Sequence, residues 1–398
     1  LHALLALPGP RNNGNPALAA ASVGADGQGA EEEDGRPSKR PRRGEQATVK
    51  TAGGGPPGGG DGGTAAAAAP GAGDPSLAAR RSEYVASMRG LQFREVELMG
   101  EHYFRSEVDK AGAGAGGEVM RQRLKRVTGE ISGLASGLPL EWDAAAFVAV
   151  DESRVDVLRA LLIPSSDTPY ANGAFLFDIF LPPAYPNVPP KVQFLTTGGG
   201  RVRFNPNLYA EGKVCLSLLG TWAGPSWDPA MSTVLQVLVS IHSMILVADP
   251  YYNEPGWERQ AATQEGRRAA RDYSNSQRYN TLAFSILPAL RALEAAATAA
   301  TGAAGGSSSA KANALAGGST FIDVLRRHFT LKRPELLRQC DEWQAEITAA
   351  AAERASAAGG GGKSKGHAAY VPGQQSAEQL VTYTAQVVPQ IKSLLAKL

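Results

Sequence analysis

The sequence has 398 residues, a formal net charge of +2 at pH 7 and only two cysteines. The near-zero charge excludes a strong electrostatic partner, such as a specific nucleic acid, for the chain as a whole. Two cysteines cannot form a disulfide framework or a four-cysteine metal site, and they indicate a reducing compartment. We therefore predict no metal site and no cofactor.

The first 77 residues form a low-complexity segment with poly-Ala tracts, poly-Gly tracts and an acidic run at 31–34. Such a segment cannot bury enough apolar surface to offset the entropy of ordering, so we predict a disordered tail. Its apolar start lacks an initiator Met and a basic n-region, and we expect a fragment end rather than a signal peptide. The basic cluster Lys39–Arg43 is either a nuclear import signal or a solvated patch, which gives an expected location in the cytoplasm, the nucleus or both.

A flanking segment, 78–117, comes next. Its apolar residues between Ser82 and Glu101 predict a helix followed by a strand, packed on the next domain. Between Val119 and Leu138, apolar positions recur at spacings of three and four, as on one face of an amphipathic helix, and the other face is basic. This helix opens a predicted core domain, residues 118–294.

Within this core domain, the sequence predicts strands joined by short turns. They are expected at 147–151, 155–163, 174–181 and 191–196. This order indicates an antiparallel meander of four strands, and helices before and after it indicate an α+β fold. The Pro-rich stretch 182–190 is predicted to be a rigid loop, because proline fixes φ and removes a hydrogen-bond donor.

Helices dominate the rest of the sequence. A buried helix is expected at 231–247, and it is too short and too polar to span a bilayer, so we predict no membrane association. His242 within it is expected to be structural. Three further segments are expected in chain order: a helix at 258–293, a linker at 295–319 and a helical extension at 320–398. Cys340, inside the extension, is expected to be a core thiol.

The stretch around Cys215 carries the chemistry. The turn Asn205-Pro206-Asn207 precedes the cysteine and brings the chain back on itself. An amide side chain could then face the sulfur and donate a hydrogen bond, and a thiol with a nearby N–H donor suits acyl transfer. The alternative from these residues alone is a small thiol buried in a core.

Four motifs in this order and spacing resemble the ubiquitin-conjugating (UBC) enzyme family. They are Tyr185-Pro186-x-x-Pro189-Pro190, Asn205-Pro206-Asn207, Cys215 and Trp227-x-Pro229. The resemblance covers about residues 118–294 and implies the UBC fold, a four-stranded meander with an N-terminal helix and C-terminal helices. The string from Asn205 to Leu219 further resembles the large apollon/BRUCE type. Asn205 departs from the family's usual histidine, and the loop between the cysteine and Trp227 is longer than usual.

This resemblance implies that Cys215 accepts ubiquitin from an activating enzyme as a thioester and passes it to a lysine of a protein substrate. Asn207 would stabilise the oxyanion of that transfer or hold the adjacent loop. Glu254, with Asp249 as second choice, would position and deprotonate the lysine; alternatively both are solvated loop charges.

The resemblance also implies two partner surfaces. The basic helix, through Arg121, Lys125 and Arg126, would bind the activating enzyme, and Val188 and Pro229 would form a ligase-contact loop. Asn187 stands where many family members carry a bulky apolar residue, which argues against a RING ligase. The flanking segments would then recruit substrate directly, as in a self-contained hybrid of conjugating enzyme and ligase.

Three alternatives remain open. A non-catalytic UBC-like scaffold would bind ubiquitin or another partner without forming a thioester. A nuclear nucleic-acid adaptor would rely on the short basic cluster Lys39–Arg43. A cysteine protease would need a partnered histidine, for which the sequence gives no motif.

Overall fold

The computed structural model describes residues 75–111, 118–300, 318–359 and 375–398. The predicted disordered tail lies outside these residues except for its last three positions, which belong to a helix beginning at Pro75. Its disorder and the basic cluster Lys39–Arg43 therefore stay predictions.

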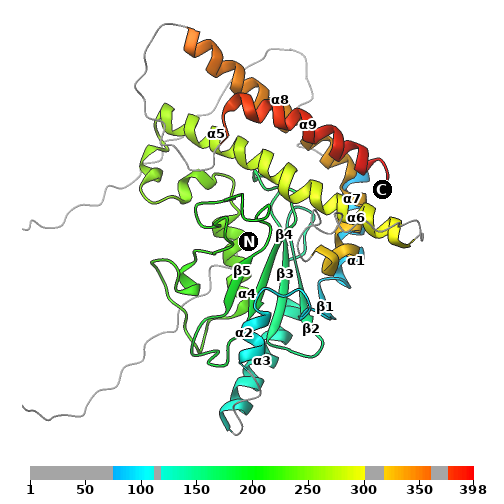
Figure 1. Ribbon diagram of the computed structural model, residues 1–398, viewed down its shortest axis with the longest axis vertical. Helices are drawn as coiled ribbons and strands as arrows, with labels where there is room; N and C mark the ends of the chain where they lie inside the picture. Colours follow the sequence, from blue (N-terminus) through cyan, green and yellow to red (C-terminus); the bar gives the residue numbers. More distant parts are fainter. Residues whose placement is uncertain (1–74, 112–117, 301–317, 360–374) are drawn as a thin grey trace, which may run out of the picture. The chain divides into compact units, whose positions relative to one another are not determined.

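The described residues form one sheet of five strands in the order β1-β2-β3-β4-β5 (Figure 1). The strands are β1 (Phe93–Val96), β2 (Ala145–Asp151), β3 (Val157–Ile163), β4 (Phe175–Phe180) and β5 (Lys191–Phe194). Strands β2 to β5 pair antiparallel, as in the predicted meander. The fold class is thus α+β, as expected.

Strand β1 shows where the flanking segment belongs. It pairs parallel to β2, with Phe93 opposite Val148, so the flank extends the sheet rather than only packing on it. The prediction of a four-stranded sheet was wrong in this respect. A parallel pair needs a long crossover connection, and here α2 and α3 lie in the connection between β1 and β2. Strand pairing over such a distance leaves no local sequence signal.

Helices surround the sheet on both faces (Figure 1). Those of the described part are α1 (Pro75–Arg89), α2 (Arg105–Lys110), α3 (Glu118–Gly137), α4 (Val234–Ser240), α5 (Gln264–Thr281), α6 (Leu287–Ala300), α7 (Ile322–Leu331), α8 (Arg333–Gly359) and α9 (Ala377–Leu395). Thr233 caps α4 in a capping box, which explains why the helix begins three residues later than predicted. Single π-helical turns extend α4 and join α5 to α6.

The predicted linker at 295–319 begins later in the structure than the sequence suggested. Helix α6 continues to Ala300, past the expected linker start at 295, because alanine is the strongest helix former and no glycine interrupts the run before Gly302. Helix α8 continues to Gly359. Residues 301–317 of the predicted linker lie outside the described residues, and the domain boundaries stay predictions.

One face of the sheet packs on α3 and α4, and we call its buried apolar residues the α3–α4 cluster. It includes Val127 and Leu134 of α3, Val237 of α4 and the sheet residues Val148 and Phe177. Side chains of successive strand residues alternate between faces, so every second residue of β2, β3 and β4 points into this cluster. All its helices and strands come from one continuous stretch of the sequence.

The opposite face packs on the helices at the two ends of the described chain, and we call its residues the flanking-helix cluster. Met88 of α1, Phe329 of α7, Trp343 of α8 and Ile391 of α9 meet there with Phe147 of β2. The predicted flank and the predicted extension therefore share one core with the sheet. Cys340 is buried in this cluster, as predicted.

The flanking-helix face also holds a buried ion pair. Arg159 of β3 and Asp178 of β4 lie opposite one another in register, and the guanidinium contacts both carboxylate oxygens, at 2.6 and 3.0 Å. Arg159 also donates to Thr320 and to the carbonyl oxygen of Glu101. Because a buried charge needs several partners, this pair ties both flanking segments to the sheet.

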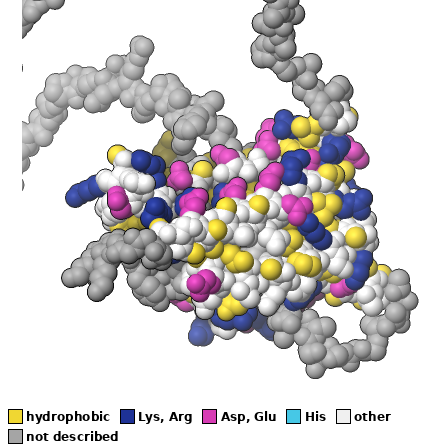
Figure 2. All heavy atoms as spheres, turned by 90° about the horizontal axis from the view of Figure 1, so that it is seen from above, with side chains coloured by type: hydrophobic (Ala, Val, Ile, Leu, Met, Phe, Trp, Pro, Cys, Tyr) yellow, Lys and Arg dark blue, Asp and Glu magenta, His cyan; other side chains and the backbone are white. Residues whose placement is uncertain are grey.

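The outer helices contact one another through polar side chains. Ion pairs join Arg271 to Glu353 and Arg278 to Glu346, which connects α5 with α8. Figure 2, which views this side of the molecule, shows basic and acidic side chains interspersed across it. Mixed charges of this kind are typical of a solvated helical surface.

Among the described residues, the continuous helical stretch Gln264–Ala300 is long and apolar enough to span a membrane by length and composition alone. Its large side chains Leu282, Ile286 and Leu290 are buried in the flanking-helix cluster, whereas most alanines at its end are exposed. The absence of membrane association stays a prediction.

Candidate active site

The turn before the cysteine is fixed by Asn205, which is fully buried. Its amide nitrogen donates to the carbonyl oxygen of Ile245 at 2.8 Å and to the Tyr170 hydroxyl at 3.3 Å. Its amide oxygen accepts from the backbone N–H of Asn207 and from the side chain of Asn253. Four hydrogen bonds thus satisfy the side chain that stands where the family usually has histidine.

After this turn the chain folds back, and Cys215 lies beside the turn. Its backbone N–H donates to the carbonyl oxygen of Asn207 at 2.9 Å, and only 2% of the residue is exposed. The return depends on Gly212, which has a φ of 91°. A Cβ atom there would lie 2.5 Å from the carbonyl oxygen of Phe194, so only glycine fits. The structure therefore brings Asn207 and Cys215 together, as the spacing suggested.

The side chain of Asn207 is half-buried and oriented for donation. Its Oδ1 is buried without a hydrogen-bond partner in the described part of the chain. No described residue accepts a hydrogen bond from its Nδ2, which leaves this donor available. An available amide N–H on the turn that pairs with the Cys215 backbone is a candidate donor to an oxyanion.

Tyr209, two residues after Asn207, was not predicted as a site residue. Burial raises the pKa of Tyr209, as does the proximity of Cys215, whereas the Arg203 guanidinium opposes this increase. The order Asn-Pro-Asn-Leu-Tyr in the sequence was a usable signal for this residue.

Glu254 and Asp249 have different surroundings. The Glu254 carboxylate lies 3.7 Å from the Arg203 guanidinium, which itself stacks on the Tyr209 ring at 4.3 Å. Asp249 is exposed and precedes the 3₁₀ turn Pro250–Asn253, and no described side chain contacts its carboxylate. Of the two acidic candidates, Glu254 is therefore the one beside the residues that surround Cys215.

The loop that carries Glu254 has a small core of its own. Tyr251 is buried and packs against the ring of Trp257 at 4.4 Å and the ring of Tyr273 at 6.1 Å. Asn253 joins the loop to the turn through its hydrogen bond to Asn205. These contacts make the loop a fixed wall of the site.

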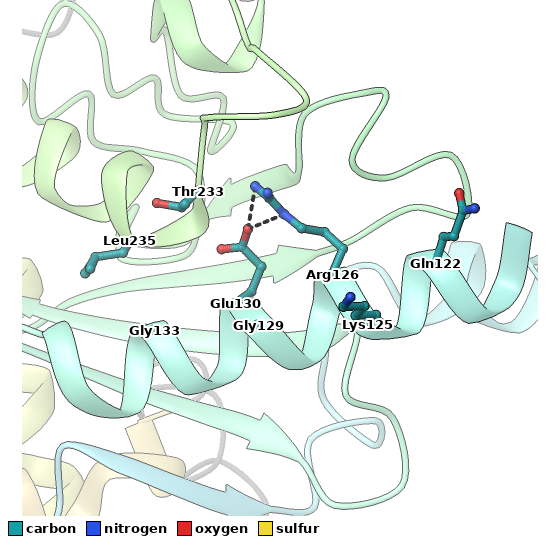
Figure 3. Close-up of a pocket in the computed structure, with 8 residues that line it drawn as sticks. All are labelled: Gln122, Lys125, Arg126, Gly129, Glu130, Gly133, Thr233 and Leu235. Atoms are coloured by element: carbon teal, nitrogen blue, oxygen red, sulfur yellow. Dashed lines mark hydrogen bonds and ion pairs between the residues drawn. The ribbon is translucent and has the colours of Figure 1, made fainter. Parts of the chain in front are cut away.

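The predicted activating-enzyme residues lie on α3, and Lys125 and Arg126 among them line a groove of about 540 Å³ between α3 and α4 (Figure 3). Arg121 and Lys125 are exposed. Arg126 instead contacts Glu130, with Nε 3.0 Å from Oε1, and donates to the carbonyl oxygen of Ser232. Arg126 thus fastens α3 to the start of α4, a role that the sequence did not reveal.

The predicted ligase-contact residues lie on two neighbouring loops. Val188 is 37% exposed, and Pro229 is exposed as well. Trp227 donates from its ring N–H to the carbonyl oxygen of Pro186 at 2.7 Å, which holds the loops together. The two residues therefore lie on joined loops, and Arg126 of α3 donates to the carbonyl oxygen of Ala230, next to Pro229.

The other titratable candidates are structural. His242 is buried, its Nε2 lies 3.0 Å from the carbonyl oxygen of Ile163, and burial lowers its pKa, as expected of a core residue. Burial raises the pKa of the Cys340 thiol to about 12, which makes it a poor nucleophile. Within the described ranges, no three His, Cys, Asp or Glu residues gather as metal ligands would.

Comparison with known proteins identifies this architecture. A family model described as ubiquitin-conjugating enzyme matches residues 140–280. The dual E2 ubiquitin-conjugating enzyme/E3 ubiquitin-protein ligase BIRC6 of Mus musculus is 38% identical over 292 residues, which cover 70% of this chain and 5% of that protein. The probable ubiquitin-conjugating enzyme protein 17 of Caenorhabditis elegans is 38% identical over 270 residues, 65% of this chain and 33% of that protein.

A plant relative matches a shorter region. The putative ubiquitin-conjugating enzyme E2 39 of Arabidopsis thaliana is 41% identical over 198 residues, 49% of this chain and 60% of that protein. This chain thus spans a small part of the long animal relatives that it matches.

Proposed function

Because residues 140–280 form a domain of the ubiquitin-conjugating enzyme family, we propose that this chain accepts ubiquitin on Cys215 and transfers it to a lysine of a protein substrate. The observation that carries the proposal is the contact between the turn and the cysteine. The Cys215 N–H donates to the Asn207 carbonyl oxygen, and the side-chain amide nitrogen of Asn207 has no acceptor among the described residues, which supports a role for this amide as a donor near the thiol.

The first step is a transthiolation. The Cys215 sulfur attacks the C-terminal carbonyl of ubiquitin, which the activating enzyme holds as a thioester. The new carbon–sulfur bond forms at Cys215 while the bond to the activating enzyme's sulfur breaks, and that sulfur leaves with the proton that Cys215 gives up. A thiol suits this step because the product remains reactive toward amines.

The second step forms the isopeptide bond. The lysine amine attacks the Cys215 thioester, and the negative charge that develops on the carbonyl oxygen accepts a hydrogen bond from Asn207 Nδ2. The carbon–sulfur bond then breaks, and Cys215 is restored as a thiol. The neutral amine loses one proton, which the Glu254 carboxylate receives as a general base in this proposal and passes on to the departing Cys215 sulfur.

The partners follow from the exposed surfaces. Lys125 and Arg121 of α3 would contact the activating enzyme, and Val188 with Pro229 would contact a ligase. The name of the mouse relative combines both activities, which supports a self-contained ligase function as a further proposal. The cytoplasm and the nucleus remain the proposed locations, on the basis of the cluster Lys39–Arg43.

A deletion is the wrong test for self-contained ligase activity. Removing residues 320–398 would take away the part of the flanking-helix cluster supplied by α7, α8 and α9, and expose the apolar face of the sheet. Charge-reversing substitutions on the exposed surfaces of these helices would leave the core in place. Loss of product with unchanged thioester formation in such variants would support substrate recruitment there.

The proposal is tested by a thioester assay on the full chain with activating enzyme, ATP and ubiquitin. We expect a product larger by one ubiquitin that disappears under reducing conditions and is absent from Cys215→Ala. The matched control is Cys340→Ala, which removes the other buried thiol and should form the product normally. If the unaltered chain forms no such product, the chain is a non-catalytic scaffold and the proposal fails.

A further inference from the structure

Arg203 joins the turn before Cys215 to the loop that carries Glu254. Its Nη2 donates to the carbonyl oxygen of Pro206 at 2.5 Å, within the turn that carries Asn207. Its guanidinium stacks on the ring of Tyr209 at 4.3 Å and lies 3.7 Å from the Glu254 carboxylate. Neither sequence patterns nor the family motifs assigned this residue a role.

Tyr209 depends on this contact for its orientation. The Arg203 guanidinium lies over the Tyr209 ring, and the Tyr209 side chain is close to Cys215. The ammonium group of Lys213 lies 5.6 Å from the ring centre, farther than the guanidinium. A guanidinium stacks on an aromatic ring over a larger area than an ammonium does, so Arg203 is the stronger constraint on the ring.

Glu254 depends on Arg203 even more directly. The backbone of its loop is fixed by the packing of Tyr251 and by the Asn253–Asn205 hydrogen bond. Among the described residues, however, Arg203 is the one partner of the Glu254 carboxylate itself. The direction of this carboxylate is therefore set by Arg203 alone.

Stability does not explain this arrangement. The two side chains of the ion pair are 27% and 37% exposed, and an ion pair in such a position contributes little to the free energy of unfolding. The Nε of Arg203 is also buried without a partner in the described part of the chain, which is unfavourable for stability. A residue that is poorly satisfied yet joins two segments of a site is better explained by the site.

We propose that Arg203 is a positioning residue for lysine transfer, because it holds the Glu254 carboxylate and the Tyr209 ring beside the Cys215 thioester. This inference rests on the proposed function. Arg203 does not touch the reacting atoms, so the charging of Cys215 by the activating enzyme does not need it. Its removal should slow only the step in which an amine attacks, since that step requires the carboxylate to reach the attacking nitrogen.

The experiment separates the two steps with full-length variants Arg203→Met and Arg203→Lys. Each is charged with ubiquitin, the charging is stopped, and the discharge to free lysine is followed at several pH values. We expect near-normal charging and about tenfold slower discharge for Arg203→Met, since a misplacement of the order of 1 Å costs up to about 10²-fold in rate. The deficit should shrink at high pH, where the lysine is already deprotonated. Arg203→Lys keeps the charge and should recover part of the rate.

Two further variants make the test specific. Arg201→Met is the matched control, because Arg201 donates to the carbonyl oxygen of Gly198 and lies over Phe284, away from the cysteine. It should discharge at the normal rate. In a Glu254→Gln background, Arg203→Met should cause little further loss, since the group that it positions is already disabled.

The outcomes are distinguishable. Discharge of Arg203→Met at the normal rate, or losses that simply add in the double variant, would overturn the positioning role while the proposed function stands. A uniform loss of charging and discharge would show a merely structural residue and overturn it too. If the unaltered chain forms no thioester, the proposed function fails and this inference with it.

Discussion

The two faces of the sheet are built from different parts of the chain. The α3–α4 cluster comes from one continuous stretch and is lined by apolar side chains such as Val148, Phe177 and Val237. The flanking-helix cluster gathers helices from both ends of the described chain and encloses charged groups, including Arg159, Asp178 and Lys332. The candidate active site adjoins the first face, because Val214 and Leu216, the neighbours of Cys215, belong to its cluster.

The difference teaches how an extended UBC domain is held together. On the flanking-helix face, polar contacts join segments that are far apart in sequence, such as Arg159 and Thr320, which are 161 residues apart. Lys332 donates to the carbonyl oxygen of Trp142 and lies over its ring, so the end of α7 contacts the segment just before β2. The flanking helices are therefore part of the folded unit, whereas the chemistry depends on the other side.

The largest effect is expected from a substitution that disrupts the core of the flanking-helix face. Phe329 of α7 is fully buried in that cluster, and Phe329→Ala should reduce the free energy of unfolding by about 3–5 kcal/mol through lost burial and a cavity. Urea denaturation measures the change, with Arg338→Ala, an exposed residue of α8, as a near-neutral control. The fraction that stays folded should still form the thioester. A loss of charging in fully folded Phe329→Ala would contradict the separation of the two faces.

A slightly smaller effect is expected at the active site, and it should leave stability unchanged. Asn207→Ala removes the proposed oxyanion donor, which should slow lysine discharge by about 10²- to 10³-fold. The Asn207 Oδ1 has no hydrogen-bond partner within the described residues, so its removal sacrifices no internal contact. Single-turnover discharge and denaturation on the same sample provide both measurements. Normal discharge together with a destabilised loop would favour the alternative in which Asn207 only holds the adjacent segment.

The smallest of the three effects is acid sensitivity of the flanking-helix face. His328 is fully buried with Nδ1 2.9 Å from the Tyr84 hydroxyl, and burial, with the nearby charge of Lys332, lowers the pKa of His328 to about 3. Below the unfolded value of about 6.5, the unfolded chain takes up a proton that the folded chain does not, so the free energy of unfolding falls with pH.

This acid effect can be isolated with one variant. From about pH 7 to about pH 5, the unaltered chain should lose about 2 kcal/mol more stability than His328→Gln, since each pKa unit corresponds to 1.36 kcal/mol. Denaturation curves at both pH values give the comparison. Equal acid sensitivity of the two proteins would show that His328 does not carry the effect.

Much of the architecture followed from local patterns in the sequence. Aliphatic runs such as 174–181 and the turns between them predicted the meander of β2 to β5, and the spacing of apolar residues predicted α3. The strand in the flanking segment was expected, but its pairing with β2 was not. The connection between these two strands is long, so their pairing leaves no local pattern in the sequence. Arg126 was expected on an exposed helix face, yet Glu130 and the start of α4 turn it inward.

What the sequence by itself determined is the part of the site that one short segment supplies. Asn205, Asn207 and Cys215 lie within a single turn and return, so the chemistry of turn residues and the lone glycine at 212 were enough to bring them together. Only the tertiary structure decided that Glu254 rather than Asp249 faces this segment, and that Arg203 joins them. The physical reason is that such contacts depend on how separate segments pack against a shared core. The local propensities of those segments do not specify which of their side chains will meet.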